Sequence, residues 1–188
     1  MNASSIPNLI SVVRLLLIVP TIWCLVKGYT EIALILFMFA GASDGVDGYL
    51  ARRYQWQSRL GGFLDPMADK TMMISILIAL AWLQEVPLWL VALVISRDII
   101  IVLGSLAYYF FIGHYAASPI LISKITTVAQ IFYVTAILFA MAELINVEWL
   151  LNGLQYAVVV STILSGCAYV VIWGRKALGQ SESVNAHD

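Results

Sequence analysis

Charged side chains are scarce in this sequence of 188 residues. Only 11% are Asp, Glu, Lys or Arg, whereas soluble domains usually carry about 25%. Hydrophobic residues make up 62% of the chain, and the mean hydropathy is +0.92. A chain this apolar has too few polar side chains to cover its surface in water. The composition therefore predicts an integral membrane protein.

The chain also has few cysteines and histidines and a net charge close to zero. Cys24 and Cys167 stand alone in apolar runs, where a small buried hydrophobe is the favoured role over a disulfide or a metal ligand. The net charge of −1 argues against nucleic acid as a partner, because phosphate binding needs a basic face. The first residues, MNASSIPN, lack the basic stretch of a cleavable signal peptide. The N-terminus is therefore expected to begin the mature fold. The absence of a transit peptide favours a bacterial plasma membrane over an organelle.

Six apolar runs are long enough to cross a bilayer, which takes roughly 20 mostly apolar residues. Short polar breaks separate the runs, and residues 125–142 and 149–174 contain no charged side chain. The sequence therefore predicts an all-α integral membrane protein with six transmembrane helices. Residues 1–175 are expected to form a single membrane domain, and residues 176–188 a short polar cytoplasmic tail. The predicted helices are 6–27, 31–52, 63–84, 87–112, 121–142 and 148–174.

The distribution of basic residues predicts the orientation of these helices. With a cytoplasmic N-terminus, Lys27 is the only basic residue in the outside loops. Basic residues concentrate in the cytoplasmic segments of membrane proteins. Both termini and the 52–62 loop are therefore placed in the cytoplasm. The basic residues on that side are Arg52, Arg53, Arg59, Lys124, Arg175 and Lys176.

Four of the six aspartates lie within 26 residues of one another, from position 44 to position 69. The first two belong to a stripe formed by Asp44, Asp47, Gly48, Ala51 and Arg52, whose spacing places them on one helical face. The glycine and the alanine leave room beside the carboxylates. This face is therefore predicted to hold a ligand rather than to pack against another helix.

The second stripe lies on the next predicted helix and contains Gly61, Asp65 and Asp69, spaced four residues apart. Pro66 follows directly and would remove the hydrogen bond to the carbonyl of Gly62 if the helix had already begun. The helix is therefore expected either to start near Asp65 or to kink there.

A short loop would fold these helices back antiparallel, so that the two stripes face one another and the four carboxylates converge. Like charges that close cannot all ionise unless cations share the site. Oxygen ligands without histidine or cysteine favour Mg²⁺, Mn²⁺ or Ca²⁺ over zinc. Two such ions near Arg52 and Arg59 suit phosphate oxygens. The alternative is a salt-bridged helix pair, but charges inside a membrane are costly and usually functional.

The two stripes resemble the signature of the CDP-alcohol phosphatidyltransferases. That signature reads D-x-x-D-G-x-x-A-R, eight residues, then G-x-x-x-D-x-x-x-D, and this chain keeps every spacing. The segments IPNLISVVRLLL, ISRDIII and ISKITTVAQ also look similar to that family. The matching positions are Asp44, Asp47, Gly48, Ala51, Arg52, Gly61, Asp65 and Asp69.

The resemblance implies six membrane helices, a homodimer, and a site with two Mg²⁺ or Mn²⁺ ions open to the cytoplasm. It implies transfer of a phosphatidyl group from CDP-diacylglycerol to an alcohol, with release of CMP. By the same resemblance Asp44 and Asp65 bridge both ions, while Asp47 and Asp69 each complete one site. Asp69 would also be the general base that takes the proton of the attacking hydroxyl.

The resemblance also implies which residues bind CDP. Gly48, Arg52 and Ser58 would hold the nucleotide, and Asn8 with Pro7 would close over it. Two of these roles agree with elementary chemistry. A glycine permits close approach of the ligand, and an arginine offers a planar fork to phosphate oxygens.

The sequence leaves two acceptor alcohols open. Glycerol 3-phosphate carries a nearly dianionic phosphate monoester, so its site should be rich in cations. In the enzymes of this family that use it, the fourth helix has a sequence similar to A-R-E with a second Arg eight residues on, and the fifth has one similar to G-K-x-K-T. Here the second cations are replaced by Ser105 and Thr126. Arg97 and Lys124 remain for one phosphodiester charge. The favoured acceptor is therefore phosphatidylglycerol, as in eukaryotic-type cardiolipin synthases, and the alternative is a phosphatidylglycerolphosphate synthase.

Three basic residues inside the predicted helices have alternative roles. Arg97 could be neutralised by Asp98, but neighbours in sequence point in different directions on a helix, so acceptor binding is favoured. Lys124 could bind the acceptor or extend to the membrane surface. Arg14 could face the cavity or reach the lipid headgroups.

Two other classes of function compete with an enzyme. A divalent-cation transporter would also need buried aspartates, but the last two helices carry almost no charge beyond Lys124. It also gives no reason for Gly48 and Arg52 on the aspartate stripe. A non-catalytic scaffold would tolerate Asp69→Asn. The enzyme is the favoured interpretation.

Overall fold

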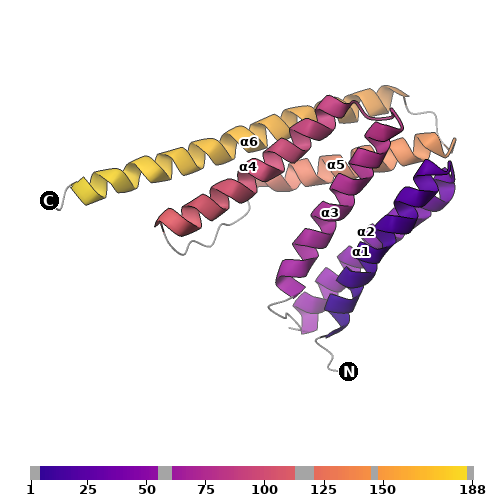
Figure 1. The fold of residues 1–188 in the computed structure, drawn as a ribbon, viewed down its shortest axis with the longest axis horizontal. Coiled ribbons are helices and arrows are strands. Elements are labelled where there is room, and N and C mark those ends of the chain that lie inside the picture. The colour runs from indigo at the N-terminus through magenta and orange to yellow at the C-terminus, as the bar shows by residue number, and fades with distance from the viewer. Residues whose placement is uncertain (1–4, 55–60, 113–120, 145–147, 186–188) are drawn as a thin grey trace. The chain divides into compact units, whose positions relative to one another are not determined.

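The computed structural model describes the backbone of residues 5–54, 61–112, 121–144 and 148–185, and side chains within 12–43, 68–104, 121–144 and 149–172. In these residues the chain forms six α-helices (Figure 1). The all-α prediction is therefore confirmed. The helices are α1 (Ser5–Val26), α2 (Thr30–Tyr54), α3 (Gly61–Trp82), α4 (Leu88–Ile112), α5 (Leu121–Met141) and α6 (Glu148–Asn185).

The helix boundaries agree with the predicted ones to within two residues, with one exception at the end of α6. That helix continues to Asn185, so the predicted polar tail is helical over most of its length. Helix α3 begins at Gly61 and runs through Pro66. Its start near Asp65, one of the two expected outcomes, is therefore wrong. Because Pro66 has no backbone N–H, the carbonyl of Gly62 receives no helical hydrogen bond from it.

The chain divides into two compact units. The first contains Met1–Val91 and Val134–Glu148, and the second contains Ala92–Tyr133 and Trp149–Asp188. Helices α4 and α5 each contribute to both units, so the chain crosses from one to the other inside helices. The four predicted metal ligands belong to the first unit, and Arg97 and Lys124 belong to the second.

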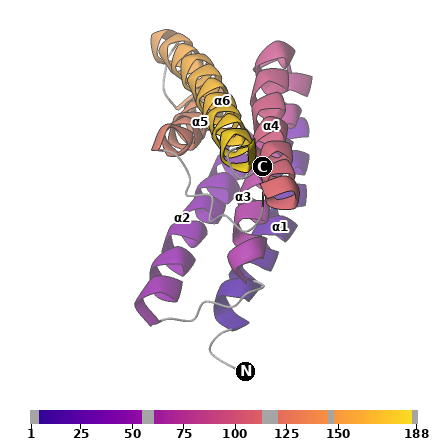
Figure 2. The same cartoon turned by 90° about the vertical axis from the view of Figure 1, so that its left-hand side faces the viewer.

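In the first unit, α1 packs against both α2 and α3 (Figure 1; Figure 2). Ala33 and Ala40 of α2 are fully buried, as is Ala68 of α3. Small side chains let helices approach closely, which matters in a membrane because lipid supplies little hydrophobic force between helices. This close packing holds the two aspartate-bearing helices on a common partner, α1.

Three helices of this unit end in the same hydrogen-bonded turn. At the end of α1, the amide of Tyr29 donates to the carbonyl of Cys24 at 2.8 Å, and that of Gly28 donates to the carbonyl of Leu25 at 3.1 Å. This is the Schellman motif, whose penultimate residue has a positive φ. The equivalent residues after α3 and α5 are Gln84 and Glu143, with φ of 64° and 55°.

These turns predict opposite effects of two substitutions on stability. Gly28 has a φ of +80°, and a Cβ there would meet nothing within 4 Å. Gly28→Ala should therefore lower the free energy of unfolding by about 1 kcal/mol through backbone strain alone, and Gln84→Gly should raise it by a similar amount. Thermal unfolding of both variants in detergent tests this expectation. Equal midpoints would show that φ does not limit stability at these turns.

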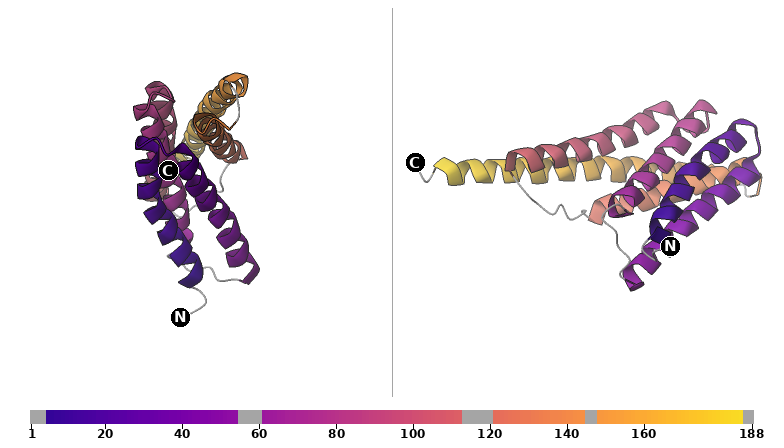
Figure 3. Two further views of the ribbon diagram at one scale, coloured as in Figure 1. Left: turned by 90° about the vertical axis from the view of Figure 1, so that its right-hand side faces the viewer. Right: turned by 60° about the horizontal axis from the view of Figure 1, so that its bottom comes forward.

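In the second unit, α6 runs alongside α4 (Figure 3) and α5 packs antiparallel to α6. The Thr126 hydroxyl donates to the carbonyl of Ser161 at 3.0 Å, and the Tyr133 hydroxyl donates to Oε1 of Gln155 at 3.4 Å. The contact nearer the start of α5 pairs with the later residue of α6, and the contact further along α5 pairs with the earlier one, so the two helices run in opposite directions. Polar side chains therefore join the three helices of this unit.

The surface of the described helices is apolar along much of its length. Large apolar side chains are exposed on all six of them, for example Leu16, Ile35, Trp82, Leu103, Phe132 and Leu164. Cys167 is exposed on the same side of α6 as Leu164, so its predicted burial is wrong, whereas Cys24 is buried as expected. Contiguous exposed apolar surface is rare in soluble monomers and typical of membrane proteins.

Two stretches of the described residues are long and apolar enough to cross a bilayer. They are Leu121–Met141 and Trp149–Ile172, with mean hydropathy of 1.6 and 1.7. Val12–Val26 and Thr30–Ser43 are apolar but shorter. These two stretches agree with the last two predicted spans, and the six-span topology stays a prediction.

Candidate functional site

The four clustered aspartates lie on two helices that share α1 as a packing partner. Asp44 and Asp47 are in α2, and Asp65 and Asp69 are in α3. Since both segments are helical, the spacings of three and four residues place each pair on one helical face. The side chain of Asp69 is described, and those of the other three aspartates lie outside the described side chains.

Asp69 is paired with Arg14 of α1. The Nη1 atom of Arg14 donates to Oδ1 of Asp69 and forms an ion pair with it. Only 1% of the Arg14 side chain is exposed, whereas 45% of the Asp69 side chain is. A buried guanidinium loses its hydration, so this carboxylate compensates a charge that would otherwise be very costly inside the fold. The pair therefore ties α1 to the aspartate-bearing face of α3.

The sequence left the role of Arg14 open, and the structure pairs it with Asp69. Arg14 lies nine residues into α1, about 14 Å from its start, and its burial excludes an extended position among the headgroups. A charged residue that deep in an apolar helix needs a partner, so the sequence alone indicates that Arg14 is paired. The partner is 55 residues away in sequence, so no local pattern identifies it.

The donor chemistry of the cluster fits a divalent cation. Carboxylate oxygens are the ligands preferred by Mg²⁺ and Mn²⁺, and nearly half of the Asp69 side chain is open to a ligand. Among the described side chains, no three of His, Cys, Asp and Glu come together. Since three of the four predicted ligands are outside those side chains, the predicted pair of metal sites stays a prediction.

The predicted CDP contacts are only partly within the described backbone. Asn8 lies in the first turn of α1, and Gly48 and Arg52 lie on α2 with the first two aspartates. Ser58 lies outside the described residues. The roles of these four residues stay predictions, since their side chains are not among those described.

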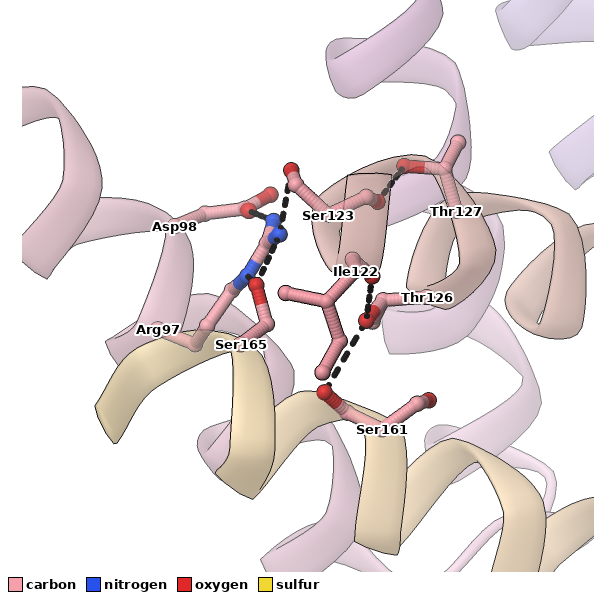
Figure 4. Close-up of polar contacts among 8 residues, drawn as sticks. All are labelled: Arg97, Asp98, Ile122, Ser123, Thr126, Thr127, Ser161 and Ser165. Carbon is pink, nitrogen blue, oxygen red and sulfur yellow. Dashed lines mark hydrogen bonds and ion pairs between the residues drawn. The ribbon is translucent and has the colours of Figure 1, made fainter. Parts of the chain in front are cut away.

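A separate polar cluster surrounds Arg97 in the second unit (Figure 4). Its guanidinium donates to the Ser165 hydroxyl from Nε at 3.2 Å and from Nη2 at 2.7 Å. The Nη2 atom also donates to the Ser123 hydroxyl at 2.6 Å, and Nη1 donates to Oδ1 of Asp98 at 2.6 Å. Arg97 is 5% exposed. This one side chain therefore joins α4, α5 and α6.

The expectation that Asp98 points away from Arg97 is wrong. Their Cβ atoms do diverge, as neighbours on a helix must, but the long arginine side chain bends back and brings Nη1 to the carboxylate. Arg97 is thus a neutralised buried cation, the alternative that the sequence argument placed second. Its role in acceptor binding stays a prediction.

Lys124 and Thr126 differ in their surroundings although both lie near the start of α5. Lys124 is exposed, and the adjacent Ser123, not Lys124, contacts Arg97. Thr126 is fully buried, and its single hydroxyl proton is shared between the carbonyls of Ile122 and Ser161, whose oxygens lie at 2.9 and 3.0 Å. The position where the sequence lacks a second cation is therefore occupied by a contact between α5 and α6.

Sequence comparison gives a family match over most of the chain. A family model described as CDP-alcohol phosphatidyltransferase matches residues 4–172. The matched region includes all six helices up to the last part of α6, and with them the aspartate stripes and the Arg97 cluster.

Individual relatives have two kinds of name. A cardiolipin synthase (CMP-forming)/mitochondrial hydrolase fusion protein of Schizosaccharomyces pombe is 32% identical over 90% of this chain and 31% of its own length. A probable cardiolipin synthase (CMP-forming) of Drosophila melanogaster is 33% identical over 90% of this chain and 58% of its own. A CDP-diacylglycerol–glycerol-3-phosphate 3-phosphatidyltransferase of Blochmanniella floridana is 35% identical over 72% of each chain. The chain thus spans less than two thirds of either cardiolipin synthase relative.

Proposed function

This chain belongs to the CDP-alcohol phosphatidyltransferase family, and from that premise we propose that it transfers the phosphatidyl group of CDP-diacylglycerol to phosphatidylglycerol. The products are cardiolipin and CMP. The observation that carries this proposal is the complete aspartate signature, whose two halves lie on the helices α2 and α3. Carboxylates inside a membrane are costly and usually functional, so these two stripes favour a ligand site over helix packing alone.

The proposed reaction is a displacement at phosphorus. The acceptor hydroxyl oxygen bonds to the phosphatidyl phosphorus, the bond from that phosphorus to the CMP oxygen breaks, and CMP leaves with the negative charge. The hydroxyl proton passes to the carboxylate of Asp69. The exposure of that side chain leaves it open to a substrate, while Arg14 holds one of its oxygens.

The rest of the cluster binds and neutralises the nucleotide. Two divalent cations, Mg²⁺ or Mn²⁺, held by the four aspartates would neutralise the pyrophosphate and make CMP a better leaving group. Gly48, Arg52, Ser58 and Asn8 are assigned to the CDP moiety. The Arg52 fork can donate to phosphate oxygens, and Gly48 leaves room for the nucleotide beside the helix.

Arg97 and Lys124 are assigned to the phosphodiester of the acceptor. Asp98 forms an ion pair with Arg97, so among the described side chains near Ser123 the unpaired positive charge on this part of α5 is that of the exposed Lys124. One positive charge complements the single negative charge of phosphatidylglycerol. It is a poor match for the nearly dianionic phosphate of glycerol 3-phosphate.

The second candidate is a phosphatidylglycerolphosphate synthase that uses glycerol 3-phosphate. The relative from Blochmanniella floridana favours it, because that protein bears the corresponding name and matches over 72% of its length. The chemistry at the aspartates would be the same. The two candidates differ only in the acceptor.

The proposed setting is a bilayer spanned by all six helices, with both termini and the aspartate site on the cytoplasmic side. The excess of basic residues in those segments supports this orientation, and apolar side chains exposed on every described helix support contact with lipid. A homodimer is expected from the family. The relatives come from both bacteria and eukaryotes, so the bacterial plasma membrane stays a prediction.

An acceptor competition tests the proposal. Purified protein in detergent with Mg²⁺ or Mn²⁺ receives CDP-diacylglycerol with phosphatidylglycerol, with glycerol 3-phosphate, or with both, and the lipid product is identified by mass. Cardiolipin with an equal amount of CMP is expected. Phosphatidylglycerolphosphate would overturn the acceptor assignment and leave the reaction standing. If no CMP is released with either alcohol, the proposed reaction is wrong, and a transporter or a non-catalytic scaffold becomes the favoured interpretation.

A further inference from the structure

The guanidinium of Arg97 is almost fully used by its neighbours. An arginine has five N–H groups, and four of them donate to the hydroxyls of Ser123 and Ser165 and to Asp98. Only 5% of the residue is exposed. A phosphate cannot bind this guanidinium through two parallel hydrogen bonds without displacing one of these partners. Arg97 must therefore act on a ligand mainly through another group.

The two serines differ in how easily a ligand can reach them. Ser165 on α6 is fully buried, whereas Ser123 is partly exposed and lies in the first turn of α5. Figure 4 shows Ser123 and Ser165 bonding to the guanidinium from different helices. Ser165 thus fixes Arg97 from inside the fold. Ser123 is the serine contact that a ligand can approach.

We propose that the Ser123 hydroxyl binds the phosphodiester of the acceptor lipid, an assignment that rests on the proposed function. Its oxygen accepts from Nη2 of Arg97 at 2.6 Å. Within the described residues its own proton has no acceptor. A hydroxyl that accepts a hydrogen bond from a cation is polarised and donates more strongly. Arg97 therefore acts on the ligand indirectly, by polarising the hydroxyl of Ser123.

The neighbouring Lys124 determines the chemical class of the ligand. Its side chain is exposed beside Ser123, so a polarised hydroxyl donor and an ammonium group are presented by consecutive residues. Arg97 and Asp98 form an ion pair, so within the described side chains of this cluster Lys124 supplies the remaining positive charge. The pair Ser123 and Lys124 thus suits an anion with one charge, the phosphodiester of a lipid headgroup.

Three variants test this assignment. Ser123→Ala should raise the KM for phosphatidylglycerol by about 10-fold or more, the usual cost of a hydrogen bond to a charged group. Its kcat at saturating acceptor and its KM for CDP-diacylglycerol should stay within about twofold of wild type, where a general structural defect would change both. Ser123→Thr keeps the hydroxyl and should restore the low KM. Thr127→Ala is the control, because within the described part of the chain its exposed hydroxyl donates to the Ser123 carbonyl alone, at 3.2 Å.

The outcomes separate this assignment from the proposed function. If wild type makes cardiolipin and Ser123→Ala leaves the KM for phosphatidylglycerol unchanged, the assignment is overturned and the function stands. A fall in kcat with no rescue by Ser123→Thr would show a structural role and would also overturn it. If wild type makes no cardiolipin, the proposed function fails, and with it a phosphodiester at Ser123.

Discussion

Replacing Asp69 by Asn should reduce kcat by about 10²- to 10⁴-fold, the usual range for loss of a general base. The amide has nearly the shape of the carboxylate but cannot take up the proton of the acceptor hydroxyl. Since 45% of the Asp69 side chain is exposed, the change leaves no cavity and little buried surface is lost. Activity is measured as CMP release, and Mg²⁺ affinity by isothermal titration calorimetry on the same preparations.

The matched control for Asp69→Asn is Glu31→Gln. Glu31 is an exposed carboxylate in the first turn of α2, 13 residues before the first aspartate of the cluster. Its activity should stay within about twofold of wild type, as for most surface substitutions. An Asp69→Asn protein with more than a tenth of the wild-type kcat would contradict the role of Asp69 as the base. Loss of activity together with loss of Mg²⁺ affinity would mark Asp69 mainly as a metal ligand.

The helices were predictable because the apolar runs are separated by residues that end a helix or begin a turn. Gly28 is the simplest case, since its positive φ ends α1 in a turn that favours glycine. The end of α6 could not be predicted in the same way. Residues 175–185 are mostly polar and lack a helix-breaking proline, so hydropathy marks the end of the membrane span and not the end of the helix.

The candidate site was predictable only where its residues are close in sequence. The aspartate pairs follow from helical spacing, and the structure confirms that both segments are helical. Arg14 and Arg97, both buried, show the limit of such patterns. Arg14 pairs with a residue 55 positions away, and Arg97 is held by Ser165, 68 positions away. The partner of a long, flexible side chain depends on which helices pack against it, and residue spacing along one helix does not reveal that.

Arg14 has the second largest expected effect. Arg14→Gln should lower kcat by about 10²-fold, the cost of misplacing a reacting group by about 1 Å, because its buried guanidinium fixes one oxygen of Asp69. Arg14→Lys keeps the charge but not the planar fork, so its kcat should lie between those of Arg14→Gln and wild type. Thr21→Val is the control for burial on α1. Thr21 is fully buried, and among the residues whose positions are described its hydroxyl donates to the Leu17 carbonyl alone, at 2.7 Å.

A double-mutant cycle decides whether Arg14 acts through Asp69. If it does, the Arg14→Gln/Asp69→Asn protein should be no slower than Asp69→Asn alone, because the group that Arg14 positions has already lost its function. Independent effects would instead multiply to about 10⁴-fold or more. Thermal unfolding of all four proteins separates this coupling from loss of fold, since removing one partner of a buried pair can also destabilise the protein. A multiplicative loss with unchanged unfolding midpoints would assign Arg14 a function apart from Asp69, such as direct contact with the nucleotide.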